Sequence, residues 1–212
     1  MMNKSMVFRG KVKLDARYID KEKIREWKER EAGNVDYVST NDILTSTFSQ
    51  SVGADILLMA INLRDRVEKV SSNDAGNYSL VVVHDSQSSV RPSDIRASLN
   101  SGPPFKRKGN SSLPGFSKTV KAQCSLITNW AFPTFNADIE LPTSSEGAVS
   151  PIELHLPVYD PRSIAFPISI IFKPKAGRLG MIYGGSPNVI NQDRLAAANA
   201  PLKDQIGIKM FS

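Results

Sequence analysis

Short stretches of alternating or continuous apolar residues predict a chain rich in β-strands. Apolar and polar residues alternate over 7–14 (VFRGKVKL), which is typical of a half-buried strand. The segments 55–63 (DILLMAINL) and 78–83 (YSLVVV) are short and largely apolar, as the central strands of a sheet are. Further strands are predicted at 121–130, 152–158, 164–172, 179–183 and, at an edge, 206–211. A turn at 175–177 joins two of them into a hairpin.

Helices are predicted between these strands, at 20–33, 39–53, 91–102 and 186–198. Asp20 and Ser39 are residue types that cap helix N-termini, and Asp42 follows Ser39 at the acidic position of a capping box. Gly33 and Gly53 are placed to end the first two helices. Because strands and helices mix without strict alternation, the predicted fold class is α/β (α+β), a single domain with a mixed β-sheet and flanking helices.

The composition fits a folded domain outside the secretory pathway. The chain has 212 residues, of which 41% are hydrophobic, so a buried core is possible. No apolar run approaches the roughly 20 residues that span a bilayer. The N-terminus shows no secretory signal, and the one cysteine, Cys124, cannot form an internal disulfide. We therefore expect a reducing, cytoplasmic setting without a membrane span.

The charge balance favours anionic partners without identifying one. Lys and Arg number 27 against 21 Asp and Glu, which gives a formal net charge of +6. Three of the basic residues, Lys106, Arg107 and Lys108, are consecutive in a Gly/Pro/Ser-rich loop at 102–117. Phe105 is the one aromatic residue beside them, and no nucleic-acid-binding signature accompanies them. Nucleic-acid binding is accordingly disfavoured, and a solvated loop is the simplest interpretation of the cluster.

Two histidines are the candidates for a general base. His84 precedes Asp85 at the end of a predicted strand, and His155 lies within an alternating segment. A catalytic histidine needs an orienting partner and a substrate within reach. Neither histidine begins a His-x-x-x-Asp motif, since Asp160 lies one position too far beyond His155. For His84 a solvated loop pair with Asp85 is favoured, and catalysis is disfavoured for both histidines.

Metal and nucleotide-loop chemistry find little support. One cysteine and two distant histidines do not supply a zinc site, so no metal is predicted. The glycine-rich phosphate-binding patterns are also absent from the sequence. Gly184, Gly185 and Ser186 precede a predicted helix, where an anion could bind, although a plain strand-to-helix turn is favoured.

Three segments in a fixed order carry a family resemblance. They are VSTNDILT at 38–45, AINLRDR at 60–66 followed by AGNY at 75–78, and SLITNW at 125–130. This order resembles the C-terminal domain of BAHD-type acyltransferases, with its Ser-Thr-x-Asp helix start, Asn-x-Arg-x-Arg strand end, Gly-Asn turn and Thr-Ser-Trp strand. The similarity covers the chain from about Val7 onward.

The resemblance implies one half of a two-domain enzyme. The implied fold is that of chloramphenicol acetyltransferase, in which two similar domains enclose a channel. The implied reaction transfers an acyl group from acyl-CoA to the hydroxyl or amine of a small molecule. In the family, the histidine of a His-x-x-x-Asp motif in the N-terminal domain deprotonates the acceptor. We interpret 1–212 as one domain that resembles the C-terminal half, with the His-x-x-x-Asp domain absent.

Site residues follow from the resemblance position by position. Thr128 and Trp130 match the Thr and Trp of Thr-Ser-Trp, which implies an oxyanion donor and a channel wall, although Thr128 fits an ordinary strand threonine equally well. The cluster Lys106, Arg107 and Lys108 is a candidate for the 3′-phosphate of CoA. The matching residues Asp42, Arg64 and Arg66 are expected to be structural, in buried ion pairs, and for the two arginines contacts to pantetheine or phosphate are the alternative.

One departure from the family pattern separates the chain from the plant-type enzymes. The segment 135–141 reads FNADIEL, in which Asp138 stands for the Asp of Asp-Phe-Gly-Trp-Gly but the rest of that motif is missing. The wider acyltransferase and condensation-domain superfamily therefore fits better.

Two main functional hypotheses stay open. The first is an acyltransferase fragment or split enzyme that needs a His-bearing partner domain. The second is a non-catalytic domain that binds an acyl-CoA or a protein. A half-enzyme should expose a large apolar face where the other domain packs, whereas a single-domain binder should be polar all round.

Overall fold

The computed structural model describes residues 12–74, 76, 78–100, 122–131, 140–142, 149–151, 154, 156–157, 159–160 and 166–207. The helices are α1 (Lys21–Glu31), α2 (Thr40–Val52), α3 (Pro92–Asn100) and α5 (Gln192–Ala197). The strands are β1 (Lys13–Ile19), β2 (Ile56–Asn62), β3 (Ser79–Asp85), β4 (Cys124–Asn129), β5 (Glu140–Pro142), β6 (Val149–Pro151), β7 (Ile168–Lys175), β8 (Arg178–Gly185) and β9 (Leu202–Gln205).

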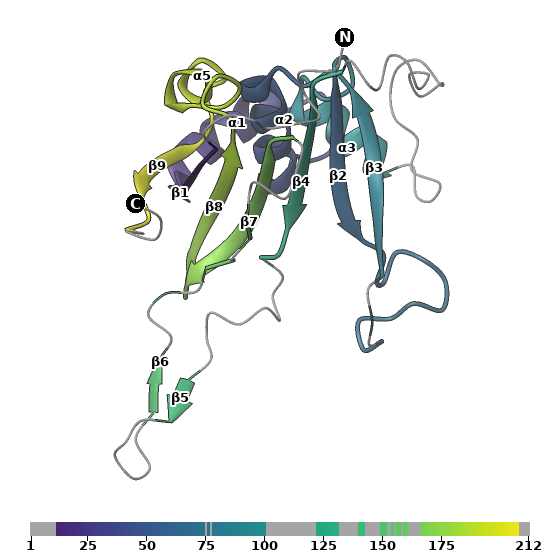
Figure 1. Cartoon of the computed structure of the whole chain (residues 1–212). Coiled ribbons are helices and arrows are strands. Elements are labelled where there is room, and N and C mark those ends of the chain that lie inside the picture. Colours follow the sequence, from purple (N-terminus) through teal and green to yellow (C-terminus); the bar gives the residue numbers. More distant parts are fainter. Residues whose placement is uncertain are drawn as a thin grey trace.

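Seven strands form one mixed sheet in the order β3-β2-β4-β7-β8-β1-β9 (Figure 1). The central strands β2, β4 and β7 run parallel, and the other pairs are antiparallel. The carboxyl ends of β2, β4 and β7 therefore meet at one end of the sheet. The short ribbon of β5 and β6 is a separate two-stranded sheet that lies beyond that end (Figure 1). The predicted class, a mixed sheet with flanking helices, is confirmed.

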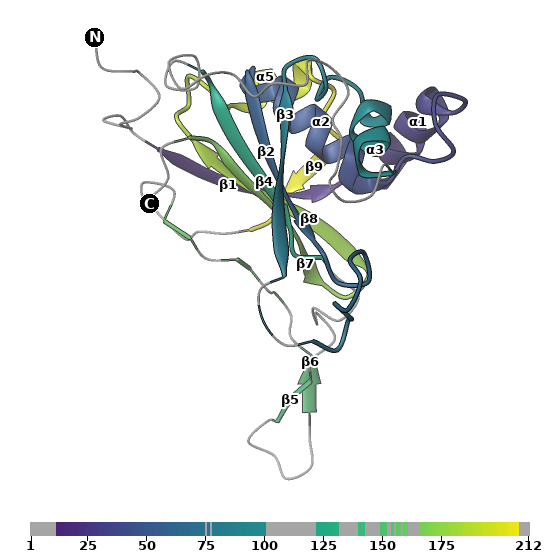
Figure 2. The ribbon, with the colours of Figure 1, turned by 90° about the vertical axis from the view of Figure 1, so that its right-hand side faces the viewer.

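The helices cover one face of the sheet. Figure 2 shows α1, α2 and α3 on the same side, and the main core lies between them and the strands. Its central side chains include Ile43, Leu44 and Phe48 of α2, all fully buried. A second, smaller core lies on the opposite face of the sheet, over β7, β8 and β1, where Ile206, Leu156 and Tyr159 pack against the strands.

The ends of α1 and α2 form where the local sequence predicts them. Asp20 caps α1 by accepting hydrogen bonds from the backbone N–H groups of Glu22 and Lys23. Ser39 and Asp42 form the predicted capping box at the start of α2, with bonds of 2.8 and 3.2 Å. Gly53 ends α2 in the left-handed conformation, at a φ of 60°, which glycine adopts without a Cβ penalty.

Two strand predictions overlap the described residues only in part. Of the predicted strand at 7–14, residues 7–11 lie outside the described residues, and β1 occupies Lys13–Ile19. The alternation continues through 13–19, where the strand pairs with β8. Near the C-terminus, β9 occupies Leu202–Gln205, and of the predicted 206–211 the described positions 206 and 207 are not strand. Ile206 contributes its side chain to the smaller core instead.

Two further predictions are corrected by local chemistry. The predicted strand at 152–158 is not a strand at its described positions Leu154, Leu156 and Pro157, and Pro157 lacks the N–H that a ladder needs. The last helix begins at Gln192 because Ser186 closes a turn, accepting bonds from the N–H groups of Val189 and Ile190.

Candidate functional site on the uncovered face of the sheet

Strand β4 turns Thr128 and Trp130 away from the helices. Ile127 pairs with Met59 of β2 and belongs to the main core under the helices. Side chains alternate along a strand, so Thr128 points to the opposite face, beside Ile170 of the smaller core. Trp130 continues this face, because its N–H still bonds to the carbonyl of Ile171 on β7, at 2.8 Å. The motif matched by the family resemblance thus lies on one surface.

That surface is apolar and only partly covered. Over β7, β8 and β1, described segments of the chain pack on it, whereas over β3, β2 and β4 its side chains are half-buried or exposed except Ile56, which is buried. Val81 is 47% exposed and Trp130 is 38% exposed. We call the uncovered part the open face. Its apolar residues are Leu58, Ala60, Val81, Val83, Leu126 and Trp130, and its polar residues include Thr128, Asn62 and Ser79. Thr128 is the hydroxyl side chain that β4 places on this face.

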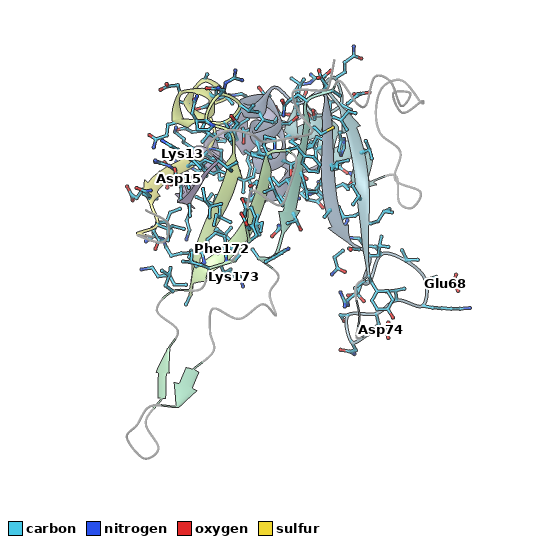
Figure 3. All side chains as sticks on the ribbon, in the orientation of Figure 1. Lys13, Asp15, Glu68, Asp74, Phe172 and Lys173 are labelled. Atoms are coloured by element: carbon cyan, nitrogen blue, oxygen red, sulfur yellow. The ribbon has the colours of Figure 1, made fainter. Side chains whose placement is uncertain are left out.

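The open face reaches the carboxyl end of the parallel strands. Ligands of α/β sheets bind at this end, outside the strand termini. The loop between β2 and β3 extends beyond it, and Figure 3 shows Glu68 and Asp74 on this loop. Phe172 and Lys173 of β7 lie toward the same end of the sheet (Figure 3).

Arg64 holds the loop between β2 and β3 together. Its guanidinium donates to the carbonyl oxygens of Asp74, at 3.0 Å, and of Gly76. It also donates to Asn62 Oδ1 at 3.3 Å and lies 5.2 Å from the centre of the Tyr78 ring. These contacts all lie within 62–78, so Arg64 stabilises the conformation of the loop.

Asp42 takes a buried ion pair with an arginine that the sequence did not single out. Arg96 of α3 donates to Asp42 Oδ2 at 2.7 and 2.8 Å, and the Asp42 side chain is fully buried. The phenol of Tyr37 accepts from Arg96 at 2.9 Å. Arg66, by contrast, is exposed on the loop after β2. Asp42 thus lies in a buried ion pair whose partner, Arg96, comes from α3.

The remaining sequence candidates lie elsewhere. His84 is fully buried and points to the helix side, since it pairs across the sheet with Leu57 of the main core. His155 and Asp138, together with the basic cluster Lys106, Arg107 and Lys108, lie outside the described residues. Within the described part, the open face therefore carries no histidine.

Cys124 is placed as an ordinary thiol. Burial, and secondarily the charge of Asp55, raise the pKa of the Cys124 thiol, which favours its neutral form over the nucleophilic thiolate. Across the described residues, no cluster of three or more His, Cys, Asp or Glu side chains could hold a metal ion. Nor does that part of the chain contain a helix long and apolar enough to cross a membrane.

The glycines before α5 serve packing. Gly184 and Gly185 end β8, and α5 begins only after the turn that follows. A Cβ on Gly185 would approach the side chains of Ile190 and Pro167 to 3.1 and 3.3 Å, so the close contact explains the glycine. The plain strand-to-helix turn is thus the better description of this segment.

The sequence alone matches no protein-family model. It also matches no curated protein. The folded chain, however, is similar to solved structures. TRI101 of F. sporotrichioides, complexed with coenzyme A and T-2, is 16% identical with a TM-score of 0.59, covering 96% of this chain and 53% of that one. TRI101 of F. graminearum, complexed with coenzyme A and T-2 mycotoxin, is 14% identical with a TM-score of 0.57, covering 92% and 49%.

Vinorine synthase shows the same likeness, at 13% identity and a TM-score of 0.51, covering 88% of this chain and 46% of that one. This chain thus spans about half the length of the structures it matches. TRI101 and vinorine synthase are BAHD acyltransferases with the chloramphenicol acetyltransferase-like fold. At such low identities the likeness establishes the fold, and this chain has the chloramphenicol acetyltransferase-like fold over half of their length.

Proposed function

We propose that this chain is one half of an acyl-CoA-dependent acyltransferase, which acts together with a second domain that carries a His-x-x-x-Asp motif. The reaction moves an acyl group from acyl-CoA to the hydroxyl or amine of a small molecule. The observation that carries the proposal is the position of Thr128 and Trp130 on the open face of a fold shared with structures that bind coenzyme A.

The open face has the properties of a protein interaction surface. Its exposed members Val81 and Trp130 are large and apolar, and they adjoin further half-buried apolar side chains. Contiguous exposed apolar surface of this kind marks interaction sites. On the other half of the same face, Leu156 and Tyr159 already cover the strands. A second domain packed over the open face would complete the cover and enclose a channel beside Thr128.

Within such a channel the two halves divide the chemistry. The partner histidine takes the proton of the acceptor, whose oxygen or nitrogen attacks the thioester carbonyl. As the carbonyl becomes tetrahedral, its oxygen gains negative charge, and the Thr128 hydroxyl donates a hydrogen bond to it. A donor preorganised in this way contributes roughly 3 kcal/mol to the transition state. When this intermediate collapses, the C–S bond breaks and CoA leaves as the thiol, protonated by the histidine that had taken the acceptor's proton. Trp130 forms the apolar wall that keeps water from the thioester.

Acyl-CoA would be anchored mainly outside the described residues. We assign the 3′-phosphate to Lys106, Arg107 and Lys108, because a dense positive charge suits a dianion. Arg64 is a weaker candidate, since its donors already bind the loop carbonyls of Asp74 and Gly76.

The test is Thr128→Val in the assembly that contains the His-x-x-x-Asp domain. We expect kcat to fall about a hundredfold to a thousandfold, the usual effect of losing an oxyanion donor, with KM for acyl-CoA nearly unchanged. Ser86→Ala removes an exposed hydroxyl from the turn after β3 and serves as the matched control. Unchanged kcat in Thr128→Val, at native stability, would remove Thr128 from the reaction.

A non-catalytic acyl-CoA-binding domain is the second candidate. It is favoured by the position of His84, which points away from the open face, so the described residues supply no histidine there. Saturable binding of acyl-CoA by the 212-residue chain alone, with no His-bearing partner in its native complex, would support this candidate over the first.

A further inference from the structure

We infer that Asn129 is a positioning residue that fixes the wall formed by Thr128 and Trp130. Asn129 lies between these two residues on β4, and strand alternation turns its side chain toward the helices. The biological meaning of this role rests on the proposed function, because the wall matters only if the open face lines a channel. The geometry itself is independent of that function.

Both the nitrogen and the oxygen of the Asn129 side-chain amide form hydrogen bonds. Its nitrogen donates to Asn41 Oδ1 in the first turn of α2, at 3.1 Å. Its oxygen accepts from the backbone N–H of Ala131 at 2.8 Å, which closes a small turn around Trp130. One side chain therefore ties the end of β4 to a helix and sets the path of the chain on either side of the tryptophan.

The helix end that receives this bond is itself held firmly. Asn41 is followed by Asp42, whose carboxylate completes the capping box with Ser39 and pairs with Arg96. Asp42 is fully buried, so the first turn of α2 has little freedom to shift. Asn41 accordingly offers a fixed acceptor, and the bond to Asn129 transmits that rigidity to the end of β4.

The residue type also fits both tasks. The resembled motif has serine at this position, and a serine hydroxyl ends one bond nearer the backbone than the asparagine amide. It can bond to the N–H of Ala131, as short polar side chains do in such turns, but it does not extend as far toward α2. Asparagine has a donor on its amide nitrogen and an acceptor on its amide oxygen, and the two contacts of Asn129 require one of each.

Trp130 reports on this geometry directly. The chain contains two tryptophans, so labelling the whole protein with 5-fluorotryptophan gives two ¹⁹F resonances, assigned with Trp130→Phe. Trp27 is buried and donates to the carbonyl of Asn199 at 3.0 Å, so its resonance serves as an internal reference. We expect Asn129→Ala to shift and broaden the Trp130 resonance and to leave that of Trp27 in place.

Companion variants separate positioning from general loosening. Asn41→Ala removes the α2 acceptor and should also displace the Trp130 resonance. Asn41→Asp keeps an acceptor oxygen and should return the Trp130 resonance to its native position. The control Asn188→Ala, at an exposed turn position, should shift neither tryptophan resonance. If Asn129→Ala does not fold, the comparison of Asn41→Ala with Asn41→Asp decides.

Two results would overturn the inference: a native Trp130 resonance in Asn129→Ala or Asn41→Ala, or equal displacement of both tryptophan signals. The inference can also be told apart from the proposed function. A displaced Trp130 signal together with no acyl transfer by the complete assembly would uphold the positioning role and refute the function.

Discussion

Replacing Arg96 by methionine should be among the most damaging single changes in the described part of the chain. Arg96 is 9% exposed and its partner Asp42 is fully buried, so neither charge is compensated by water. Methionine keeps much of the side-chain volume while removing the charge and the donors. Asp42 would then keep its bond from the N–H of Ser39 but lose both bonds to the guanidinium.

The expected magnitude follows from that unpaired carboxylate. Removing one partner of a buried ion pair costs about 3–5 kcal/mol of the free energy of unfolding. For a chain of this size that corresponds to a fall in Tm of very roughly 6–20 °C. The bond of Arg96 to the Tyr37 phenol is lost as well, and the total of about 3–5 kcal/mol includes this loss.

Chemical denaturation followed by circular dichroism measures this cost. Arg25→Met is the matched control, because Arg25 pairs with Glu22 at 2.8 Å on the surface, with 69% of its side chain exposed. Such a surface pair contributes less than about 1 kcal/mol. Adding Asp42→Asn to Arg96→Met should recover part of the loss, since asparagine can cap α2 without a buried charge. A cost for Arg96→Met no larger than that for Arg25→Met would refute this account of the α2–α3 contact.

Three further changes test other parts of the structure. Burial, and next the hydrogen bond to Asp15, raise the pKa of Tyr183. The stability that its neutral phenol contributes is therefore fully present below the unfolded-state pKa of about 10 and is lost as the pH rises toward the higher pKa of the folded state. Tyr183→Phe should flatten the alkaline fall in denaturation midpoints above about pH 10. Glu31 is buried and accepts from the N–H of Ser93 in the first turn of α3 at 3.3 Å, so Glu31→Ala should cost about 1–2 kcal/mol in denaturant titrations and Glu31→Gln less. Neutralising 106–108 should weaken binding of CoA to the level of dephospho-CoA, measured by calorimetry, and leave dephospho-CoA binding unchanged; an equal loss for both ligands would exclude a 3′-phosphate contact.

Features decided by neighbouring residues could be predicted from the sequence. The caps of α1 and α2 depend on side chains within one turn of the helix end, so Asp20, Ser39 and Gly53 identify them directly. The hairpin of β7 and β8 was equally predictable, because its turn residue Gly177 has a φ of 65° that favours glycine.

Features decided by distant residues could not. Strand β1 continues to Ile19 because it pairs there with β8 and β9, and the local alternation alone does not fix that end. Arg96 lies 54 residues from Asp42 in the sequence, and no local pattern predicts that the two residues pair. Alternation places Thr128 and Trp130 on a common face, but only the sheet order and the helix positions show that this face is the uncovered one.

The central claim is that the open face is completed by a second domain with a His-x-x-x-Asp motif. The most direct test is to immunopurify the native protein from its own cells with antibody raised to this segment and to identify the eluate by mass spectrometry. The account predicts a His-x-x-x-Asp domain, either in the same polypeptide at about twice the size expected for 212 residues or in a co-purifying one. A single polypeptide of the 212-residue size, free of any such partner, would contradict it.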